Sequence, residues 1–273
     1  MFFYNFISLS NRLCAGMMLS SLYYYLKVRK SQKDDLRASR VLEKAVRWIF
    51  ERRVLNDEES DALLIESVMC GCRLEDLLER RTVLFVNEKR FPPGLPYRQF
   101  GLRIAYLYPY LPVGRQLLDA DRRVAGCIYR FKEGNYTESL LDEFCELFEA
   151  MNLAKGRYML VCIPASNMER MEMRYLRFSR ELAARMEWVD GFGAILPVKH
   201  EQVHLSGQRR LLTEDDYLID RTRLRGARVV LLDDLLTSGL TILSVKRVLC
   251  QVGAHPVAAV FVGRTLEKPS TWN

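Results

Sequence analysis

The stretch VVLLDDLLTSGLT, residues 229–241, decides the fold of this chain. Four apolar residues run directly into two adjacent aspartates, Asp233 and Asp234, and a small turn rich in hydroxyl groups follows. Aspartate is unfavourable in strands, and neighbouring carboxylates repel each other. We therefore expect the pair to bind a ligand or another group. The pattern predicts a buried strand, a tight turn and then an amphipathic helix.

The turn between this predicted strand and helix has the composition of an anion site. Small residues at a helix N-terminus expose backbone N–H groups, which can point at a phosphate. Thr237, Ser238 and Thr241 add hydroxyl groups, and Gly239 lets the backbone approach closely. The two aspartates cannot hold a phosphate, but they can accept hydrogen bonds from sugar hydroxyls or act through hydrated Mg²⁺. The sequence therefore predicts a sugar-phosphate site.

From about residue 124 the chain alternates between strand-like and helical segments. The apolar runs that read as strands are residues 124–131, 157–164, 193–198, 226–234 and 256–264. Such alternation predicts an α/β fold with a parallel sheet covered on both faces. Ligands of such sheets gather beyond the carboxyl ends of the strands, which is where the aspartates and the turn fall.

The N-terminal part has a different pattern. Apolar residues recur at three- and four-residue spacings over residues 34–55, as in an amphipathic helix, and the stretch 90–101 carries three prolines, as in a linker. Six of the seven excess positive charges also lie in residues 1–115. We therefore divide the chain into a helical region over residues 1–115, of unknown role, and a parallel-sheet domain over residues 116–273.

Composition indicates a soluble cytoplasmic protein. The apolar fraction of 49% and the charged fraction of 27% are ordinary for a globular chain. The seven cysteines have no disulfide spacing, and Cys162 and Cys250 sit in apolar runs, so we expect reduced, mostly buried thiols. The pair Cys70 and Cys72 has no histidine nearby, which disfavours a zinc site.

The apolar N-terminus does not read as a membrane span. Asn5, Asn11 and Arg12 interrupt it, and its longest apolar run falls far short of the roughly 18–20 residues that a transmembrane helix needs. We expect a helix that is buried or faces a partner. The partner would be a second copy of the chain, another protein or, given the basic excess, a nucleic acid.

The stretch 229–241 resembles the phosphoribosyl-pyrophosphate (PRPP) signature of type I phosphoribosyltransferases, with four apolar residues, two acids and a Thr/Gly-rich loop. The resemblance extends over about residues 125–265 and implies a Rossmann-like phosphoribosyltransferase domain. By this resemblance Asp233 and Asp234 contact the ribose hydroxyls and bind Mg²⁺ through water. The residues that would hold the 5′-phosphate are Thr237, Ser238, Gly239, Leu240 and Thr241.

The same resemblance implies further site residues. The sequence IPAS at 163–166 resembles the pyrophosphate loop, which makes Ala165 and Ser166 candidates there. The polar stretch 199–211 stands where the family keeps its flexible catalytic loop. The basic residues in this stretch would meet the charge of the pyrophosphate. They are Lys199, His200, Arg209 and Arg210, and Lys199 and Arg209 are the catalytic candidates among them. A plain solvated loop explains the same residues equally well.

Two further comparisons concern the branch of the phosphoribosyltransferase family that the chain resembles and the acceptor of the phosphoribosyl group. The stretch 174–183, RYLRFSRELA, is similar to a helix of the ComF-type, amidophosphoribosyltransferase-like branch. Thr237 stands where 6-oxopurine salvage enzymes keep an aspartate as general base, which disfavours hypoxanthine and guanine as acceptors. The acceptor base or amine stays open.

The favoured interpretation is a Mg²⁺-dependent phosphoribosyltransferase that binds PRPP or a ribose 5-phosphate nucleotide and transfers or releases the phosphoribosyl group. A non-catalytic regulator is the alternative. It would bind PRPP or a nucleotide and report through its N-terminal helices to a protein or nucleic-acid partner. Release of pyrophosphate distinguishes the two.

Overall fold

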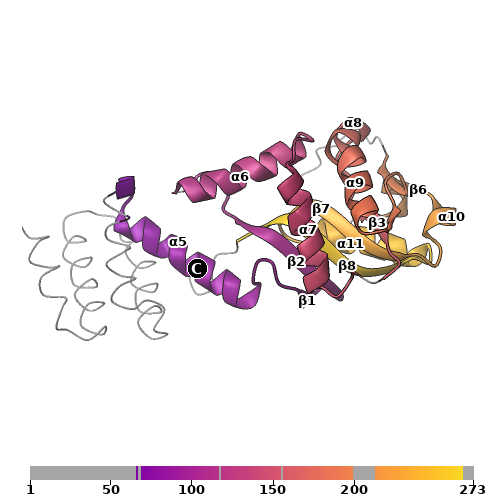
Figure 1. Ribbon diagram of the computed structural model, residues 1–273, viewed down its shortest axis with the longest axis horizontal. Helices are drawn as coiled ribbons and strands as arrows, with labels where there is room; N and C mark the ends of the chain where they lie inside the picture. The colour runs from indigo at the N-terminus through magenta and orange to yellow at the C-terminus, as the bar shows by residue number, and fades with distance from the viewer. Residues whose placement is uncertain (1–65, 67–68, 117, 155, 199–212, 267–273) are drawn as a thin grey trace, which may run out of the picture. The chain divides into compact units, whose positions relative to one another are not determined.

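The structure is a computed structural model (Figure 1). It describes residues 66, 69–116, 118–154, 156–198 and 213–266. The chain divides into two compact units, of which the first comprises residues 1–90, 113–119 and 266–273 and the second residues 91–112 and 120–265. The first unit contains helix α5 (Leu74–Arg90). The predicted helix at the N-terminus lies outside the described residues.

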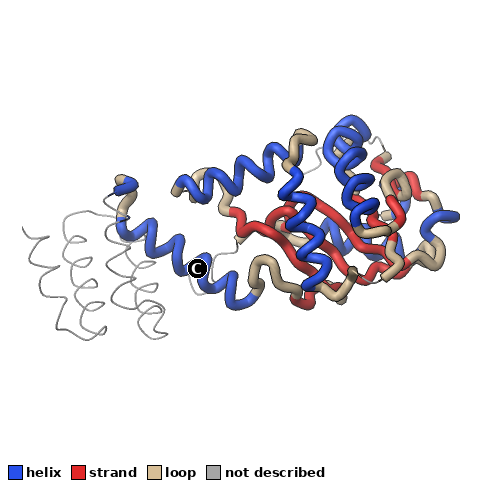
Figure 2. The backbone as a smooth tube through the Cα atoms, viewed as in Figure 1, coloured by secondary structure: helices blue, strands red, loops and turns tan. Residues whose placement is uncertain are grey.

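The second unit is built on a six-stranded sheet with the order β1-β2-β8-β7-β3-β4 (Figure 2). These strands are β1 (Tyr97–Gln99), β2 (Leu102–Tyr110), β3 (Met159–Cys162), β4 (Val189–Asp190), β7 (Arg228–Leu236) and β8 (His255–Thr265). All neighbouring strands are parallel except β1 and β2. The predicted α/β class with a mostly parallel sheet is therefore confirmed.

The connections between these strands are mainly helical. They contain α6 (Asp119–Lys132), α7 (Glu138–Ala150), α8 (Met168–Met171), the π-helix η2 (Glu172–Leu176), α9 (Arg177–Arg185), η3 (Glu214–Asp216), α10 (Arg221–Leu224) and α11 (Leu240–Gln251). A separate two-stranded antiparallel sheet joins β5 (Ile195–Pro197) to β6 (Tyr217–Ile219). The segment 193–198 was expected as a strand, and the structure places it in this small sheet.

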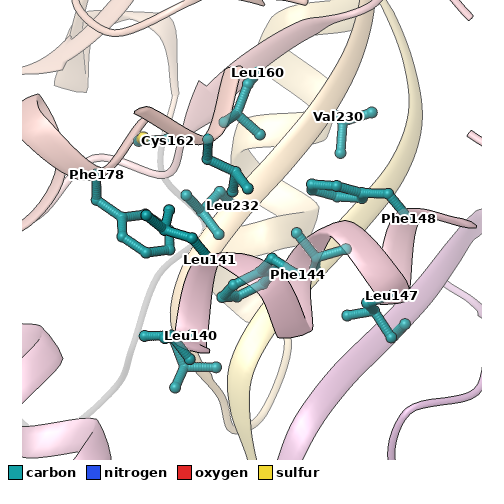
Figure 3. Packing of buried hydrophobic residues seen from close by; sticks show 14 of the residues in the cluster. Leu140, Leu141, Phe144, Leu147, Phe148, Leu160, Cys162, Phe178, Val230 and Leu232 are labelled. Carbon is teal, nitrogen blue, oxygen red and sulfur yellow. The ribbon is translucent and has the colours of Figure 1, made fainter. Parts of the chain in front are cut away.

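The sheet is covered on both faces. One buried cluster contains side chains of α7 and α9 against Leu160, Val230 and Leu232 of the central strands. Figure 3 shows the α7 side chains Leu141, Phe144 and Phe148 pointing toward these strand residues. The other cluster packs α11 against the opposite face, and in Figure 1 α7 lies in front of the strands while α11 lies behind them.

The sheet begins earlier in the chain than the predicted boundary between residues 115 and 116. Strands β1 and β2 both precede it, and the unit that holds the sheet starts at Phe91. Pro109 lies inside β2. β1 pairs with β2 only over residues 102–104, so Pro109 lies in a part of β2 with a single neighbouring strand. Proline is tolerated at such an edge because no hydrogen bond is lost on the open side.

The prediction of a strand at residues 124–131 is wrong. This segment lies within helix α6, whose buried residues are Asp121, Ala125, Ile128 and Phe131. Their spacing of three and four residues is helical, and the β-branched and aromatic residues hid it in a short window. The expectation for Cys250 is also wrong, because it is exposed on α11, whereas Cys162 is buried on β3 as expected.

Truncating a buried side chain of the central strand should lower the free energy of unfolding. Leu231 on β7 is fully buried, so Leu231→Ala should lower the free energy of unfolding by roughly 2–5 kcal/mol through the cavity it leaves. Leu218→Ala on β6 is the matched control, because that side chain is 61% exposed. Denaturant unfolding of both variants measures the difference. Equal stability of the two would contradict the placement of β7 at the centre of the sheet.

Candidate functional site

The two aspartates lie where the connections of neighbouring strands diverge. β3 pairs with β7 only as far as Leu232, whose carbonyl also accepts a hydrogen bond of 2.8 Å from the Ile163 N–H. After β3 the chain passes to the helices on one face, and after β7 it passes to α11 on the other. Such a divergence at the carboxyl ends of parallel strands is where ligands of open α/β sheets bind. Asp233 and Asp234 are the first residues of β7 beyond the end of β3.

Side chains from two helices already contact the acid pair. Tyr175 donates a hydrogen bond of 2.8 Å from its hydroxyl to Asp233 Oδ1, which also accepts the Asp234 N–H at 2.8 Å. Arg174 forms an ion pair with Asp234 Oδ2, and Lys132 Nζ, at the end of α6, lies 3.7 Å from Asp234 Oδ1. Both cations therefore contact Asp234, while Asp233 is held by hydrogen bonds.

The π-helix η2 explains how two consecutive residues reach two consecutive acids. It lies between α8 and α9, and it contains both Arg174 and Tyr175. Single π-helical turns inside α-helices are rare and frequently occur at functional sites. Tyr175 is fully buried, so the wider turn is fixed by packing and directs both polar groups at the end of β7.

The electrostatics of the pair are unusual for aspartate. Burial, and next the charge of Asp234, raises the pKa of Asp233 to about 7, although the hydrogen bond from Tyr175 opposes the rise. Burial, and next the charge of Asp233, raises the pKa of Tyr175 well above its ordinary range. Tyr175 therefore remains a hydrogen-bond donor, and Asp233 gains or loses a proton near neutral pH. Perturbed groups of this kind gather at functional sites.

This raised pKa predicts a pH-dependent stability. Between the ordinary pKa of 3.8 and the raised value of about 7, the folded protein binds the proton of Asp233 more tightly than the unfolded chain does. Its contribution to stability therefore falls as pH rises from about 4 to about 7, and is constant above. Asp233→Asn should remove this fall, so the stability of the variant relative to the wild type should be about 4 kcal/mol more favourable at pH 8 than at pH 4.

Unfolding curves of the wild type and Asp233→Asn at several pH values measure this effect. Asp190→Asn is the control, because that aspartate caps a turn by accepting the Phe192 N–H and lies on a different strand, β4. A stability difference between wild type and Asp233→Asn that does not change with pH would contradict the raised pKa.

The turn after the acid pair opens onto the N-terminus of α11. Gly239 is the N-cap residue with φ +80°, in the left-handed region that favours glycine. Thr237, Ser238 and Thr241 are exposed, and Leu240 is half-buried. A helix of 12 residues starts here, and the N–H groups and dipole of a helix N-terminus favour an anion. The Leu240 N–H lies 3.5 Å from Ser238 Oγ. The predicted strand, turn and helix are therefore present, and anion binding at this turn stays a prediction.

Gly239 itself is not at the surface. It is buried, and a Cβ atom on it would lie 2.2 Å from Cζ of Phe100. Phe100 belongs to the turn between β1 and β2, and its carbonyl accepts a hydrogen bond of 2.7 Å from Lys246 Nζ of α11. A side chain at Gly239 would therefore lower stability as well as disturb the turn, and sequence alone does not reveal the ring of Phe100.

The predicted pyrophosphate loop follows β3. Ala165 is half-buried against the core and Ser166 is exposed. Arg170 Nη1 donates to Ser166 Oγ at 3.1 Å, and the Arg170 N–H donates to Asn167 Oδ1 at 2.9 Å. The structure thus places this loop and the acid pair beyond the carboxyl end of β3, with the acid pair still inside β7.

Some predicted residues lie outside the described part of the chain, and others were missed. The former are Lys199, His200, Arg209 and Arg210. The latter are Lys132, Arg174, Tyr175 and Phe100, which contact the acid pair or Gly239. The adjacent Arg-Tyr at 174–175 was visible in the sequence, but a regular helix would not direct both residues at one site.

The described residues contain no group of three or more His, Cys, Asp or Glu side chains that could hold a metal ion. The acid pair fits Mg²⁺ only as a partial site, because Asp234 is already ion-paired and Asp233 has one hydrogen-bonded oxygen. Mg²⁺ usually keeps several waters and takes one or two carboxylates together with the phosphates of its ligand. Any metal here would depend on the ligand for its other contacts.

The fold and the site together define an α/β protein with an acid pair and a helix N-terminus at the strand ends. Comparison of the sequence with protein-family models and with curated proteins gave no match. No helix in the described ranges has the length and apolar character to cross a membrane.

Proposed function

We propose that this protein binds PRPP or a ribose 5-phosphate nucleotide with Mg²⁺ and transfers the phosphoribosyl group to an acceptor. The supporting observation is that an acid pair and an anion-binding turn follow each other at the divergence of β3 and β7. The N–H groups at the start of α11 would hold the 5′-phosphate. The carboxylates of Asp233 and Asp234 would accept hydrogen bonds from the vicinal ribose hydroxyls.

The chemistry would be substitution at C1 of the ribose. The bond from C1 to pyrophosphate breaks, pyrophosphate leaves with the electron pair, and the acceptor forms the new bond to C1. The transition state resembles an oxocarbenium ion, whose positive charge the nearby carboxylates stabilise. Mg²⁺, when bound, would stabilise the negative charge that develops on the leaving pyrophosphate. The aspartates position the sugar and do not attack it.

A non-catalytic regulator is the second candidate. It is favoured by the internal partners of the acid pair, since Arg174, Lys132 and Tyr175 already occupy groups that an enzyme would turn toward its substrate. Such a protein would bind PRPP or a nucleotide and signal to a partner, for which residues 1–115 or a second copy of the chain are candidates. The proposed location of either form is the cytoplasm.

Turnover distinguishes the two candidates. The full-length protein is incubated with PRPP, Mg²⁺ and a panel of bases and amines, and pyrophosphate release is measured beside binding. An enzyme releases pyrophosphate with at least one acceptor, and the release stops in the variant with Asp233→Asn and Asp234→Asn. Binding without release supports the regulator. A folded protein that neither binds nor releases would refute both.

A further inference from the structure

The partner that the chain supplies to Asp234 restricts the ligands of this site. Arg174 and Asp234 form their ion pair with side chains that are only 14% and 10% exposed. A sugar hydroxyl that donates to this carboxylate has to share it with the guanidinium or replace it. Removing one member of a largely buried pair leaves a charge without compensation, which is costly.

Arg174 has hydrogen-bonding capacity beyond this contact. Its Nε is buried and has no hydrogen-bond partner in the described part of the chain, while Nη1 contacts Asp234. A guanidinium carries five N–H donors in a planar fork, and the fork matches the oxygens of a phosphate. A displaced Arg174 is therefore suited to an anionic group of the ligand.

Asp234 also remains compensated when Arg174 leaves. Lys132 Nζ lies 3.7 Å from its Oδ1, on the carboxylate oxygen that Arg174 does not contact. Exchange of Arg174 for a sugar hydroxyl therefore leaves the carboxylate with one cation. What the exchange needs is a new anion for Arg174.

We infer that Arg174 makes the site selective for a ribose 5-phosphate that carries a second anionic group on C1, such as a pyrophosphate. This inference rests on the proposed function, because it concerns the ligand of the same site. The vicinal hydroxyls belong to C2 and C3, and C1 is bonded to C2. We assign the C2 hydroxyl to Asp234, so a substituent on C1 lies beside the hydroxyl that replaces Arg174, and an anionic one gives the guanidinium a new partner. Ribose 5-phosphate offers none there.

Binding measurements with two ligands test the inference. The probes are PRPP and ribose 5-phosphate, each titrated with Mg²⁺ into the full-length wild type, Arg174→Gln and Arg174→Lys. The control is Arg177→Gln, three residues further on at the start of α9, because the Arg177 side chain is 75% exposed and pairs with Glu181 at 2.7 Å. Thermal melts of each variant establish that it is folded.

The ratio of the two affinities is the readout. Wild type and Arg177→Gln should prefer PRPP, and Arg174→Gln should reduce this preference roughly tenfold by weakening PRPP binding and strengthening ribose 5-phosphate binding. Arg174→Lys keeps the charge but lacks the planar fork, so it should lose part of the preference. Where Arg174→Gln does not fold, a folded Arg174→Lys with the preference of the wild type overturns the inference. A ratio unchanged in Arg174→Gln, or lost equally in Arg177→Gln, overturns the inference alone. If the folded wild type binds neither probe, the proposed function fails as well.

Discussion

Replacing both acids, Asp233→Asn with Asp234→Asn, should weaken the binding of PRPP by about 3–6 kcal/mol. Each carboxylate would accept a hydrogen bond from a sugar hydroxyl, and a hydrogen bond to a charged group contributes about 1.5–3 kcal/mol. The change corresponds to a rise in Kd of roughly a hundredfold to ten-thousandfold. Isothermal titration calorimetry with PRPP and Mg²⁺ measures it directly.

The matched control for the double variant is Asp142→Asn. Asp142 on α7 is an exposed carboxylate that pairs with Arg185 of α9, so its loss removes negative charge without touching the acid pair. Its Kd should equal that of the wild type. The assignment of the acids to the ribose is wrong if the double variant, shown to be folded by its melting curve, binds PRPP as tightly as the control.

Gly239→Val should abolish ligand binding and also lower stability. The left-handed conformation of Gly239 costs a residue with a side chain about 1–2 kcal/mol. The collision with the ring of Phe100 adds the roughly 1–3 kcal/mol that is typical of overpacking. The same side chain would displace the turn from the phosphate, so calorimetry should detect no binding while the melting temperature falls.

Two further variants separate these causes. Gly226 has φ +74° and open space around it, so Gly226→Val carries the backbone cost without a collision and should leave ligand binding intact. Phe100→Ala removes the ring, and combining it with Gly239→Val should recover the part of the stability lost to the collision. If Gly239→Val binds PRPP as well as the wild type, the turn is not the phosphate site.

The central part of the fold was predictable because its apolar runs are unambiguous. β7 and β8 are flanked by clear turn signals and lie at the centre of the sheet, and their positions were confirmed. α6 and β2 were not predicted. The apolar residues of α6 include strand-favouring types, and the proline of β2 is acceptable only at an open edge. Both depend on neighbours that are distant in the sequence.

The acid pair and the turn were also predictable, because they are contiguous in the sequence. Their partners were not, since Lys132 and Tyr175 reach Asp234 and Asp233 from helices α6 and η2. The π-helical turn that directs Arg174 and Tyr175 has no reliable sequence signal. Phe100 approaches Gly239 from a hairpin 139 residues earlier in the chain.

The most direct test of a phosphoribosyl site is an NMR titration of the labelled full-length protein with PRPP and Mg²⁺, followed at the backbone amides. The N–H groups at the start of α11 would donate to the 5′-phosphate, so the largest shifts should occur at Gly239, Leu240 and Thr241. Ribose 5-phosphate should shift the same three amides at higher concentration. Saturable binding that leaves these amides unchanged, or no binding to the folded protein at millimolar ligand, would contradict the account.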